Sequence, residues 1–390
     1  MADMPAISVD RLVRIRQRLV REGIDALACR LPENVLCLSG YWPLSGVSFL
    51  VVPQDGEPLL IAPATEAELL PLGIPAHVFP WGRVNDPSPL VSVCARVNRM
   101  LAPRRLGWEA DFEAVAPAHV AGEVLVPAAS TAAMLREAFP GTELMDASAL
   151  LAAERAIKLP HDLAGLRQAA AAAERGVLAF EAAVRPGVSE PELLAAIEGA
   201  VLRDGLCLDG VRSVRAYAQV LSGPRTAGAW GPAYLPVCRQ LEAGDIVLLE
   251  LATVVDGYWS DLTRVRIAGT PQSRQREVHG AVQAAVSAAL AAVHPGAMAA
   301  AIDAAARASL HGAGLAAAFP HHTGHGLGFR YHEPLPFLHP HSPHRLEAGM
   351  VCTIEPGVYV EGFGGLRIEE NIVVSPTGSE LLSVPARAWA

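Results

Sequence analysis

Four acidic side chains in the second half of the sequence are spaced to lie on common faces of strands. Glu250 and Asp261 lie in two strand-like segments joined by Asp256-Gly257, a pair typical of a tight hairpin turn. With the turn centred on that pair, Glu250 is opposite Thr263, and Asp261 points to the same face as Thr263 because side chains alternate along a strand. We therefore expect the carboxylates of Glu250 and Asp261 to point the same way.

A second hairpin-like segment carries the other two acids. Met350 to Val360 and Leu366 to Val374 read as strands separated by a glycine-rich loop. If this loop centres near Phe363, Glu369 lies diagonal to Glu355 on one face of the hairpin. Ionised acids gathered on a partly buried face repel one another unless cations compensate them or some take up protons. A bound metal ion is the simplest solution.

A segment rich in histidine and glycine separates the two hairpins. It reads His321-His322-Thr323-Gly324-His325-Gly326-Leu327-Gly328 and is followed by His332-Glu333-Pro334. The glycines disfavour a helix and let the backbone approach a ligand closely, while the imidazoles can bind a divalent ion or move protons. Imidazole together with carboxylates suits Mn, Zn, Co or Fe better than Ca. A solvated acid or a hydrogen-bonded structural histidine is the alternative for any single residue, whereas the combination favours a metal site.

The second half of the chain also contains an internal repeat. Val184-x-Pro186-Gly187 recurs as Val293-x-Pro295-Gly296, and the segment Glu242 to Glu250 recurs, with the same Glu-Ala-Gly start, as Glu347 to Glu355. A duplication of helices and hairpins predicts two structural halves facing each other around a pseudo-twofold axis, with the last acid of each segment at an equivalent position. Chance matching in a sequence of biased composition is the alternative.

Helix and strand signals divide the chain into two domains. Residues 1–150 are expected to form an α/β domain, and residues 151–390 an α+β domain built from the repeat. The expected helices cover about Val9–Leu27, Ala128–Phe139, Leu150–Lys158, Asp162–Val184, Ser189–Gly205, Gln272–Val293 and Met298–Leu310. The expected strands of the first domain are Ala26–Ala28, Val35–Leu38, Val47–Val52, Pro58–Ala62, Ala76–Phe79 and Leu106–Trp108, and Gly210–Ile267 is rich in strand signals.

Composition excludes several classes of protein. The 390 residues are 51% hydrophobic and 18% charged, enough to bury two cores, and the net charge of −9 argues against a nucleic-acid partner. The longest apolar helical stretch, Ala281–Val293, is shorter than the ~20 residues of a membrane span. The N-terminus carries charged residues instead of an apolar signal-peptide core, so we expect a cytoplasmic protein. Six scattered cysteines lack Cys-x-x-Cys spacing and are expected to be buried free thiols.

With these motifs the chain resembles the Xaa-Pro peptidase, prolidase and creatinase family over nearly its whole length. The resemblance rests on Gly23-Ile24-Asp25-Ala26-Leu27, Pro32-Glu33-Asn34-Val35-Leu36-Cys37-Leu38-Ser39-Gly40-Tyr41, Arg155-Ala156-Ile157-Lys158, Asp256-Gly257-Tyr258-Trp259-Ser260-Asp261-Leu262-Thr263-Arg264, the histidine- and glycine-rich segment, Ile354-Glu355-Pro356-Gly357 and Gly365-Leu366-Arg367-Ile368-Glu369. It implies a creatinase-like α/β N-terminal domain, a C-terminal domain with the duplicated "pita-bread" fold, and a homodimer in which the N-terminal domain of one subunit closes the other's active-site mouth.

Metallopeptidases of this family bind metal through two Asp, one His and two Glu. Matching by motif gives four of these ligands as Asp261, His325, Glu355 and Glu369, and places Glu250 at the position of the first Asp. The longer side chain of Glu250 shifts its carboxylate by the length of a carbon–carbon bond. The resemblance therefore implies one or two divalent ions per chain, Mn first with Zn, Co or Fe as alternatives, and the change at Glu250 favours a one-metal or a distorted two-metal site.

Position 230 is a second departure from the family pattern. The family's proton-handling His lies in a segment resembling Ser222 to Gly231, and here that position is Trp230. An indole stacks and donates one hydrogen bond but cannot shuttle a proton near neutral pH. Trp230 either lines a pocket for an apolar or cationic small molecule or fills core space. Arg225 nearby either binds a substrate carboxylate or lies on the surface.

Three functions are open from the sequence. The first is a metal-dependent hydrolase that cleaves the C–N bond of a dipeptide, an imino-acid amide or a related small metabolite, with Glu355 handling the proton. His321, His332 and Arg367 match the family's remaining active-site residues. The second is a metal-free, creatinase-like hydrolase of a cyclic or guanidino substrate, or a lyase, which the change at Glu250 favours. The third is a non-catalytic pita-bread binding module.

Overall fold

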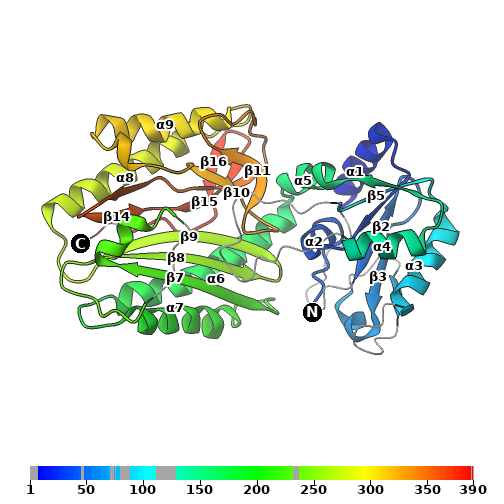
Figure 1. Ribbon diagram of the computed structural model, residues 1–390, viewed down its shortest axis with the longest axis horizontal. Coiled ribbons are helices and arrows are strands. Elements are labelled where there is room, and N and C mark those ends of the chain that lie inside the picture. Colours follow the sequence, from blue (N-terminus) through cyan, green and yellow to red (C-terminus); the bar gives the residue numbers. More distant parts are fainter. Residues whose placement is uncertain are drawn as a thin grey trace. The chain divides into compact units, whose positions relative to one another are not determined.

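The computed structural model describes residues 8–44, 48–70, 74, 76–79, 88–110, 129–231, 237–387 and 389. The chain divides into two compact units (Figure 1). Unit 1 comprises Met1–Glu113 and Val124–Arg155, and unit 2 comprises Ala114–Glu123 and Ala156–Ala390. Within the described part of the chain, no helix is both long and apolar enough to cross a membrane.

Unit 1 is built around a mixed six-stranded sheet, which confirms the predicted α/β class. Its strands are β1 (Ala26–Cys29), β2 (Phe49–Pro53), β3 (Leu59–Pro63), β4 (Ala76–Phe79), β5 (Arg105–Trp108) and β6 (Glu143–Asp146), in the order β4-β3-β2-β1-β5-β6. Its helical elements are α1 (Val9–Glu22), α2 (Pro32–Ser39), η1 (Ala64–Leu69), α3 (Ser88–Leu101), α4 (Ala129–Ala138) and α5 (Ser148–Ala156). Helices α3 and α4 pack on apolar side chains of β1, β2, β3 and β5 and form one core with them.

The predicted strand Val35–Leu38 is wrong, because these residues lie in helix α2. Pro32 occupies the first turn of α2, where a missing N–H costs no hydrogen bond. The backbone N–H of Leu31, just before the helix, donates to the carboxylate of Glu109 over 2.9 Å. A carboxylate far away in the sequence therefore fixes the start of this helix.

Other expectations for the elements differ in detail. Val47 and Ala128, the first residues of a predicted strand and a predicted helix, lie outside the described residues. The rest of those elements corresponds to β2 and α4, except that Ser48 precedes β2 and Phe139 follows α4. Helix α3 was not predicted. The expectation that the cysteines are buried is wrong for Cys207 and Cys238, which are exposed.

Unit 2 contains two helix pairs that flank a set of strands (Figure 1). The helical elements are α6 (Pro160–Ala183), α7 (Glu190–Gly205), η2 (Gly223–Gly228), α8 (Ser273–Ala292), α9 (Ala299–Gly312) and η3 (Ala316–Ala318). The strands are β7 (Val214–Ser222), β8 (Ile246–Val255), β9 (Tyr258–Ile267), β10 (Gly324–Gly326), β11 (Glu333–Leu338), β12 (Val351–Ile354), β13 (Gly357–Val360), β14 (Gly364–Arg367), β15 (Glu370–Ser375) and β16 (Gly378–Leu381). They form sheets ordered β7-β8-β9, β11-β10-β12-β15-β16 and β13-β14.

The sequence repeat corresponds to two equivalent halves of unit 2. Helices α6 and α7 belong with β7 to β9, and α8 and α9 belong with the later strands. The turn after α6 bonds to the start of one repeated segment through Gly187 N–H to Leu241 O (2.8 Å). The turn after α8 does the same through Gly296 N–H to Leu346 O (2.7 Å). The duplicated pita-bread architecture is therefore confirmed, with equivalent contacts at equivalent places.

The two hairpins agree with their predicted registers to different degrees. In the first, Asp256 (φ 46°) and Gly257 (φ 90°) form the turn, and Glu250 pairs with Thr263 as predicted. In the second, each strand is interrupted, so that β12 pairs with β15 and β13 pairs with β14. The paired residues on both sides of the interruption centre the hairpin on Gly362 instead of Phe363. The register carried through that break therefore places Glu355 directly opposite Glu369, not diagonal to it.

Candidate active site

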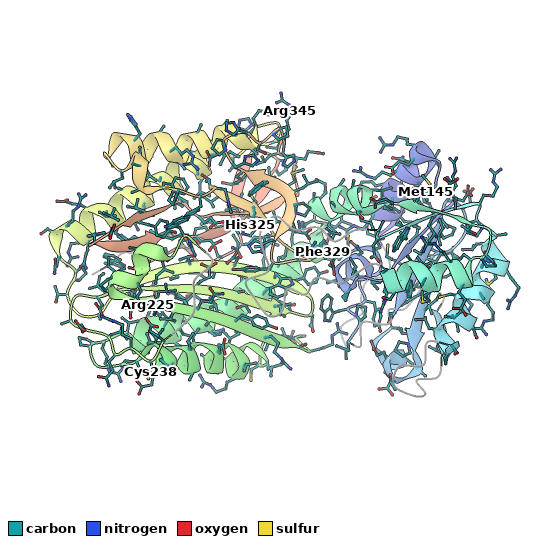
Figure 2. The ribbon with its side chains drawn as sticks, in the orientation of Figure 1. Met145, Arg225, Cys238, His325, Phe329 and Arg345 are labelled. Atoms are coloured by element: carbon teal, nitrogen blue, oxygen red, sulfur yellow. The ribbon has the colours of Figure 1, made fainter. Side chains whose placement is uncertain are left out.

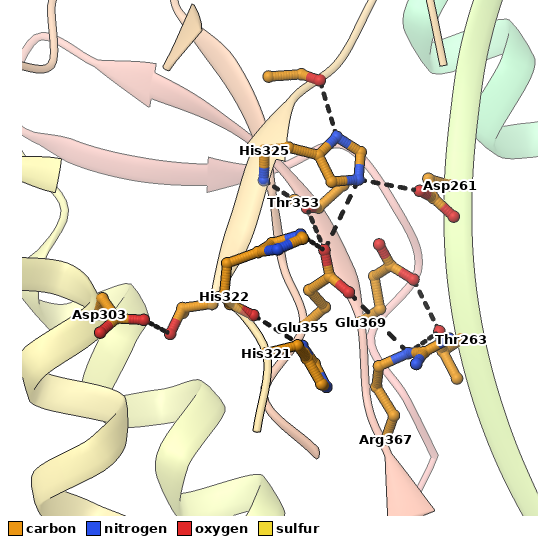
Figure 3. Close-up of polar contacts among 12 residues, drawn as sticks. Asp261, Thr263, Asp303, His321, His322, His325, Thr353, Glu355, Arg367 and Glu369 are labelled. Carbon is orange, nitrogen blue, oxygen red and sulfur yellow. Dashed lines mark hydrogen bonds and ion pairs between the residues drawn. The ribbon is translucent and has the colours of Figure 1, made fainter. Parts of the chain in front are cut away.

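The structure brings the side chains predicted to bind metal together between the two halves of unit 2 (Figure 3). Asp261 comes from β9, His325 from β10, and Glu355 and Glu369 from the two ends of the break in the second hairpin. His325 Nε2 lies 3.4 Å from Asp261 Oδ2 and 3.6 Å from Glu355 Oε1. Ligand atoms of Asp261, His325 and Glu369 all lie within 4.8 Å of one another. The separations of 3.4 and 3.6 Å fit atoms that each lie about 2.1 Å from one ion, since two such atoms are at most about 4.2 Å apart.

The polar atoms of this cluster fit a divalent cation. Glu369 Oε1 is buried and has no hydrogen-bond partner, which is costly for a carboxylate oxygen unless a cation is bound beside it. His325 Nδ1 lies 2.9 Å from the backbone oxygen of Gly326, which fixes the proton on Nδ1 and turns Nε2 toward the acids. One imidazole nitrogen with several carboxylate oxygens is a donor set for Mn, Zn, Co or Fe.

Glycines let the strand of His325 lie against its neighbours. A Cβ at Gly324 would lie 2.0 Å from the backbone oxygen of Thr353, and one at Gly326 would lie 2.1 Å from that of Leu335. Only glycine leaves room for this approach. The glycines of the His-Gly segment therefore position the imidazole by close backbone packing.

Burial and mutual repulsion act on the acids. Burial, followed by the charges of neighbouring carboxylates, raises the pKa of Asp261 and of Glu369 well above the usual range. Burial also disfavours ionisation of Glu355, but its contacts with His322 and the other histidines outweigh this and lower its pKa. His322 Nε2 lies 3.4 Å from Glu355 Oε1. A cation in the cluster would relieve the repulsion that these shifts reflect.

Glu250 is held differently from the other acids. The guanidinium of Arg367 forms an ion pair with Glu250 Oε2, and Thr263 Oγ1 lies 2.9 Å from the same oxygen. The hydroxyl of Tyr331 lies 2.9 Å from Glu250 Oε1 and 2.9 Å from Asp261 Oδ1. The sequence analysis missed Tyr331, which lies among the unassigned residues before His332.

The remaining histidines adjoin the cluster in two places. Burial lowers the pKa of His321 to about 3, so its ring is neutral. Its Nδ1 lies 2.8 Å from the backbone oxygen of His322 and its Nε2 lies 3.0 Å from the hydroxyl of Tyr359. The ring of His332 packs against that of His325, with ring centroids 4.4 Å apart. His322, which the sequence analysis did not select, contacts Glu355, and the only sequence signal for it is the doubled histidine.

The two candidate substrate-binding residues lie in different surroundings. Trp230 is 52% exposed, so the alternative that it fills core space is wrong. It follows Ala229, whose backbone oxygen accepts a hydrogen bond of 3.1 Å from Arg367. The guanidinium of Arg225 forms an ion pair of 2.8 Å with the buried carboxylate of Glu190, and Figure 2 shows Arg225 well away from His325. Arg225 thus already contacts a carboxylate within the chain.

Comparisons with known proteins agree with this architecture. Residues 164–376 match the model of metallopeptidase family M24, and residues 11–157 match that of the creatinase/prolidase N-terminal domain. A putative dipeptidase, YkvY of Bacillus subtilis, is 30% identical over 96% of this chain and 98% of that protein.

Solved structures give the same result. The prolidase of Pyrococcus horikoshii superimposes with a TM-score of 0.78 at 25% identity, over 97% of this chain and 99% of that one. The Xaa-Pro dipeptidase of Bacillus anthracis gives a TM-score of 0.80 at 25% identity, over 97% and 98%. These matches support the metal-dependent hydrolase over the metal-free and non-catalytic alternatives. The chain belongs to metallopeptidase family M24 and carries a creatinase/prolidase N-terminal domain.

Proposed function

We propose that this protein is a metal-dependent dipeptidase that hydrolyses the amide bond of short peptides, with proline-containing dipeptides as the first class to test. The observation that carries the proposal is the unpartnered, buried Oε1 of Glu369 beside the ligand atoms of Asp261 and His325. The dipeptidase and prolidase relatives support the substrate class. An imino-acid amide or a related small metabolite with the same C–N bond is within this proposal.

The divalent ion is proposed to bind to Asp261, His325, Glu355 and Glu369, with Mn first and Zn, Co or Fe as alternatives. When bound, such an ion polarises an amide carbonyl and lowers the pKa of water. The histidine contacts that lower the pKa of Glu355 keep its carboxylate ionised. Glu355 is proposed to accept the proton of the attacking water because of its place in the cluster. His322, 3.4 Å from Glu355 and partly exposed, lies where that proton can be passed on.

His321 and His332 have more limited roles in this proposal. The contacts of His321 with Tyr359 and with the backbone of His322 hold its ring in one tautomer, which makes it a positioning residue for the loop that carries His322. His332, whose ring packs on that of His325, is proposed to contact the substrate carbonyl or leaving group.

Trp230 is proposed to bind substrate. Its half-exposed indole follows Ala229, which Arg367 ties to the acid cluster. An aromatic face favours an apolar ring such as that of proline. A homodimer, which the family resemblance implies, belongs to this proposal and is measured by light scattering during gel filtration.

The test is metal content and dipeptide hydrolysis of the purified full chain loaded separately with Mn, Zn, Co or Fe. Asp261→Ala and His325→Ala are each expected to abolish metal retention and hydrolysis, because each removes a ligand from a buried cluster. His294→Ala, an exposed histidine in the turn after α8, is the matched control and should retain the wild-type metal content. Unchanged metal content in both ligand variants would contradict the assignment.

A further inference from the structure

Glu250 is separated from its neighbouring acids by side-chain hydroxyls. Tyr331 lies between Glu250 and Asp261, with its hydroxyl 2.9 Å from an oxygen of each. Thr263 lies between Glu250 and Glu369, with its hydroxyl 2.9 Å from Oε2 of Glu250 and 2.7 Å from Oε2 of Glu369. An ion shared by Glu250 and either of these acids would have to occupy the place of one of the two hydroxyls.

A positively charged side chain, that of Arg367, already neutralises the charge of Glu250. The guanidinium of Arg367 contacts Oε2 of Glu250, and its Nε–H donates to the hydroxyl of Thr263 over 2.7 Å. Oε1 of Glu250 accepts from Tyr331, so both oxygens of this carboxylate have partners supplied by the chain. The contrast is with Glu369, whose Oε1 is buried and has no partner.

Packing holds the hydroxyl of Tyr331 in place. The side chain is only 3% exposed. Its ring lies against Trp259, with ring centroids 5.7 Å apart, and against His332, with centroids 4.5 Å apart. Because the phenol is buried and packs against two other rings, the hydroxyl cannot swing away to admit an ion without repacking the site.

We propose that Tyr331, Thr263 and Arg367 withhold Glu250 from metal binding, so that the centre holds one divalent ion instead of a pair. The inference rests on the proposed function, because it takes Asp261, His325, Glu355 and Glu369 as the ligands of that ion. Arg367 supplies the positive charge that Glu250 would otherwise draw from a second ion.

The test counts ions and asks whether they are neighbours. Metal-free full-length protein is titrated with Mn²⁺ by calorimetry, and bound Mn is measured by mass spectrometry after gel filtration. Electron paramagnetic resonance of the loaded protein is expected to give the six-line spectrum of an isolated Mn²⁺ at one ion per chain. Two ions per chain with an exchange-coupled spectrum would overturn this inference and leave the proposed function standing, whereas no retained ion would overturn both.

Tyr331→Phe sharpens the test because it removes the hydroxyl between Glu250 and Asp261 while keeping the ring. The two carboxylates then face each other without a shared proton, and we expect a second Mn²⁺ to bind at least about tenfold more tightly than to the wild type. Tyr258→Phe is the matched control, since it also removes a phenol that donates to a buried acid, Asp162 (3.1 Å), outside the cluster. A second-ion affinity unchanged by Tyr331→Phe would refute the role of Tyr331, and the wild-type ion count tests the proposal even if this variant does not fold.

Discussion

The two hairpins of unit 2 start from the same Glu-Ala-Gly sequence but are built differently. In the first, β8 and β9 are each ten residues long and pair without interruption. In the second, both strands are broken, into β12 and β13 on one side and β14 and β15 on the other. Pro356 lies in one break, where it has no N–H to donate to a strand ladder.

The break changes what an acid at an equivalent position can do. Glu250 lies in an unbroken strand, and chain groups occupy both of its oxygens. Glu355 and Glu369 lie in the breaks, where their N–H groups bond to other segments, Glu355 to Thr323 O (2.8 Å) and Glu369 to Thr263 O (3.3 Å). Outside the strand ladder, these two acids both join the cluster around His325. Duplication thus provided two equivalent acids, and the broken half places its acid in the candidate metal site.

The largest expected difference is between the effects of replacing the two equivalent acids, Glu355 and Glu250. Glu355→Gln should lower kcat for dipeptide hydrolysis by about 10³-fold, because it removes a proposed ligand that also accepts a proton. Glu250→Gln should leave one ion bound, with an affinity no more than about tenfold weaker, since Glu250 acts on the site only through its neighbours. Steady-state kinetics and metal analysis of both variants check this. Loss of the ion in Glu250→Gln would erase the distinction between the halves.

A smaller difference is expected between the stability costs of replacing a glycine in each of the two hairpins. A Cβ at Gly365 in β14 would lie 2.0 Å from the backbone oxygen of Thr226 in η2, so Gly365→Ala should destabilise the protein by about 3 kcal/mol. Gly257→Ala affects a tight turn with φ 90° and should cost about 1 kcal/mol through backbone strain. Denaturant unfolding of the two variants measures both costs, and equal costs would show that the broken hairpin is no more tightly packed than the continuous one.

The features that the sequence predicted correctly are those with a local signal. Asp256-Gly257 set the register of the first hairpin because a two-residue turn leaves one way to pair the strands. The second register was misplaced because a longer glycine-rich loop admits several centres. Helix α2 was misread as a strand because the group that fixes its start, Glu109, is distant in the sequence.

The residues of the candidate site also divide into those that a local sequence motif indicates and those that no local motif indicates. Asp261, His325, Glu355 and Glu369 were found because each lies in a recognisable motif, and the structure places them together. Tyr331 was missed because nothing near it in the sequence indicates its contact with Glu250, which only the packing of β8 against the loop after β10 creates. The sequence likewise does not indicate that both carboxylate oxygens of Glu250 have partners within the chain, since those partners come from three separate segments.

The smallest expected effect is that of Pro356, the residue most visibly associated with the break. Pro356→Ala restores an N–H and gives the unfolded chain more freedom, which should cost about 0.4–1 kcal/mol of stability. We expect the affinity for the ion to change by no more than about threefold, because the N–H of Glu355 is already bonded to Thr323 and that of Glu369 to Thr263. Calorimetric titration of the metal-free variant measures this change. If the affinity instead fell more than tenfold, Pro356 itself would hold the break open, and the contrast between the halves would depend on one residue.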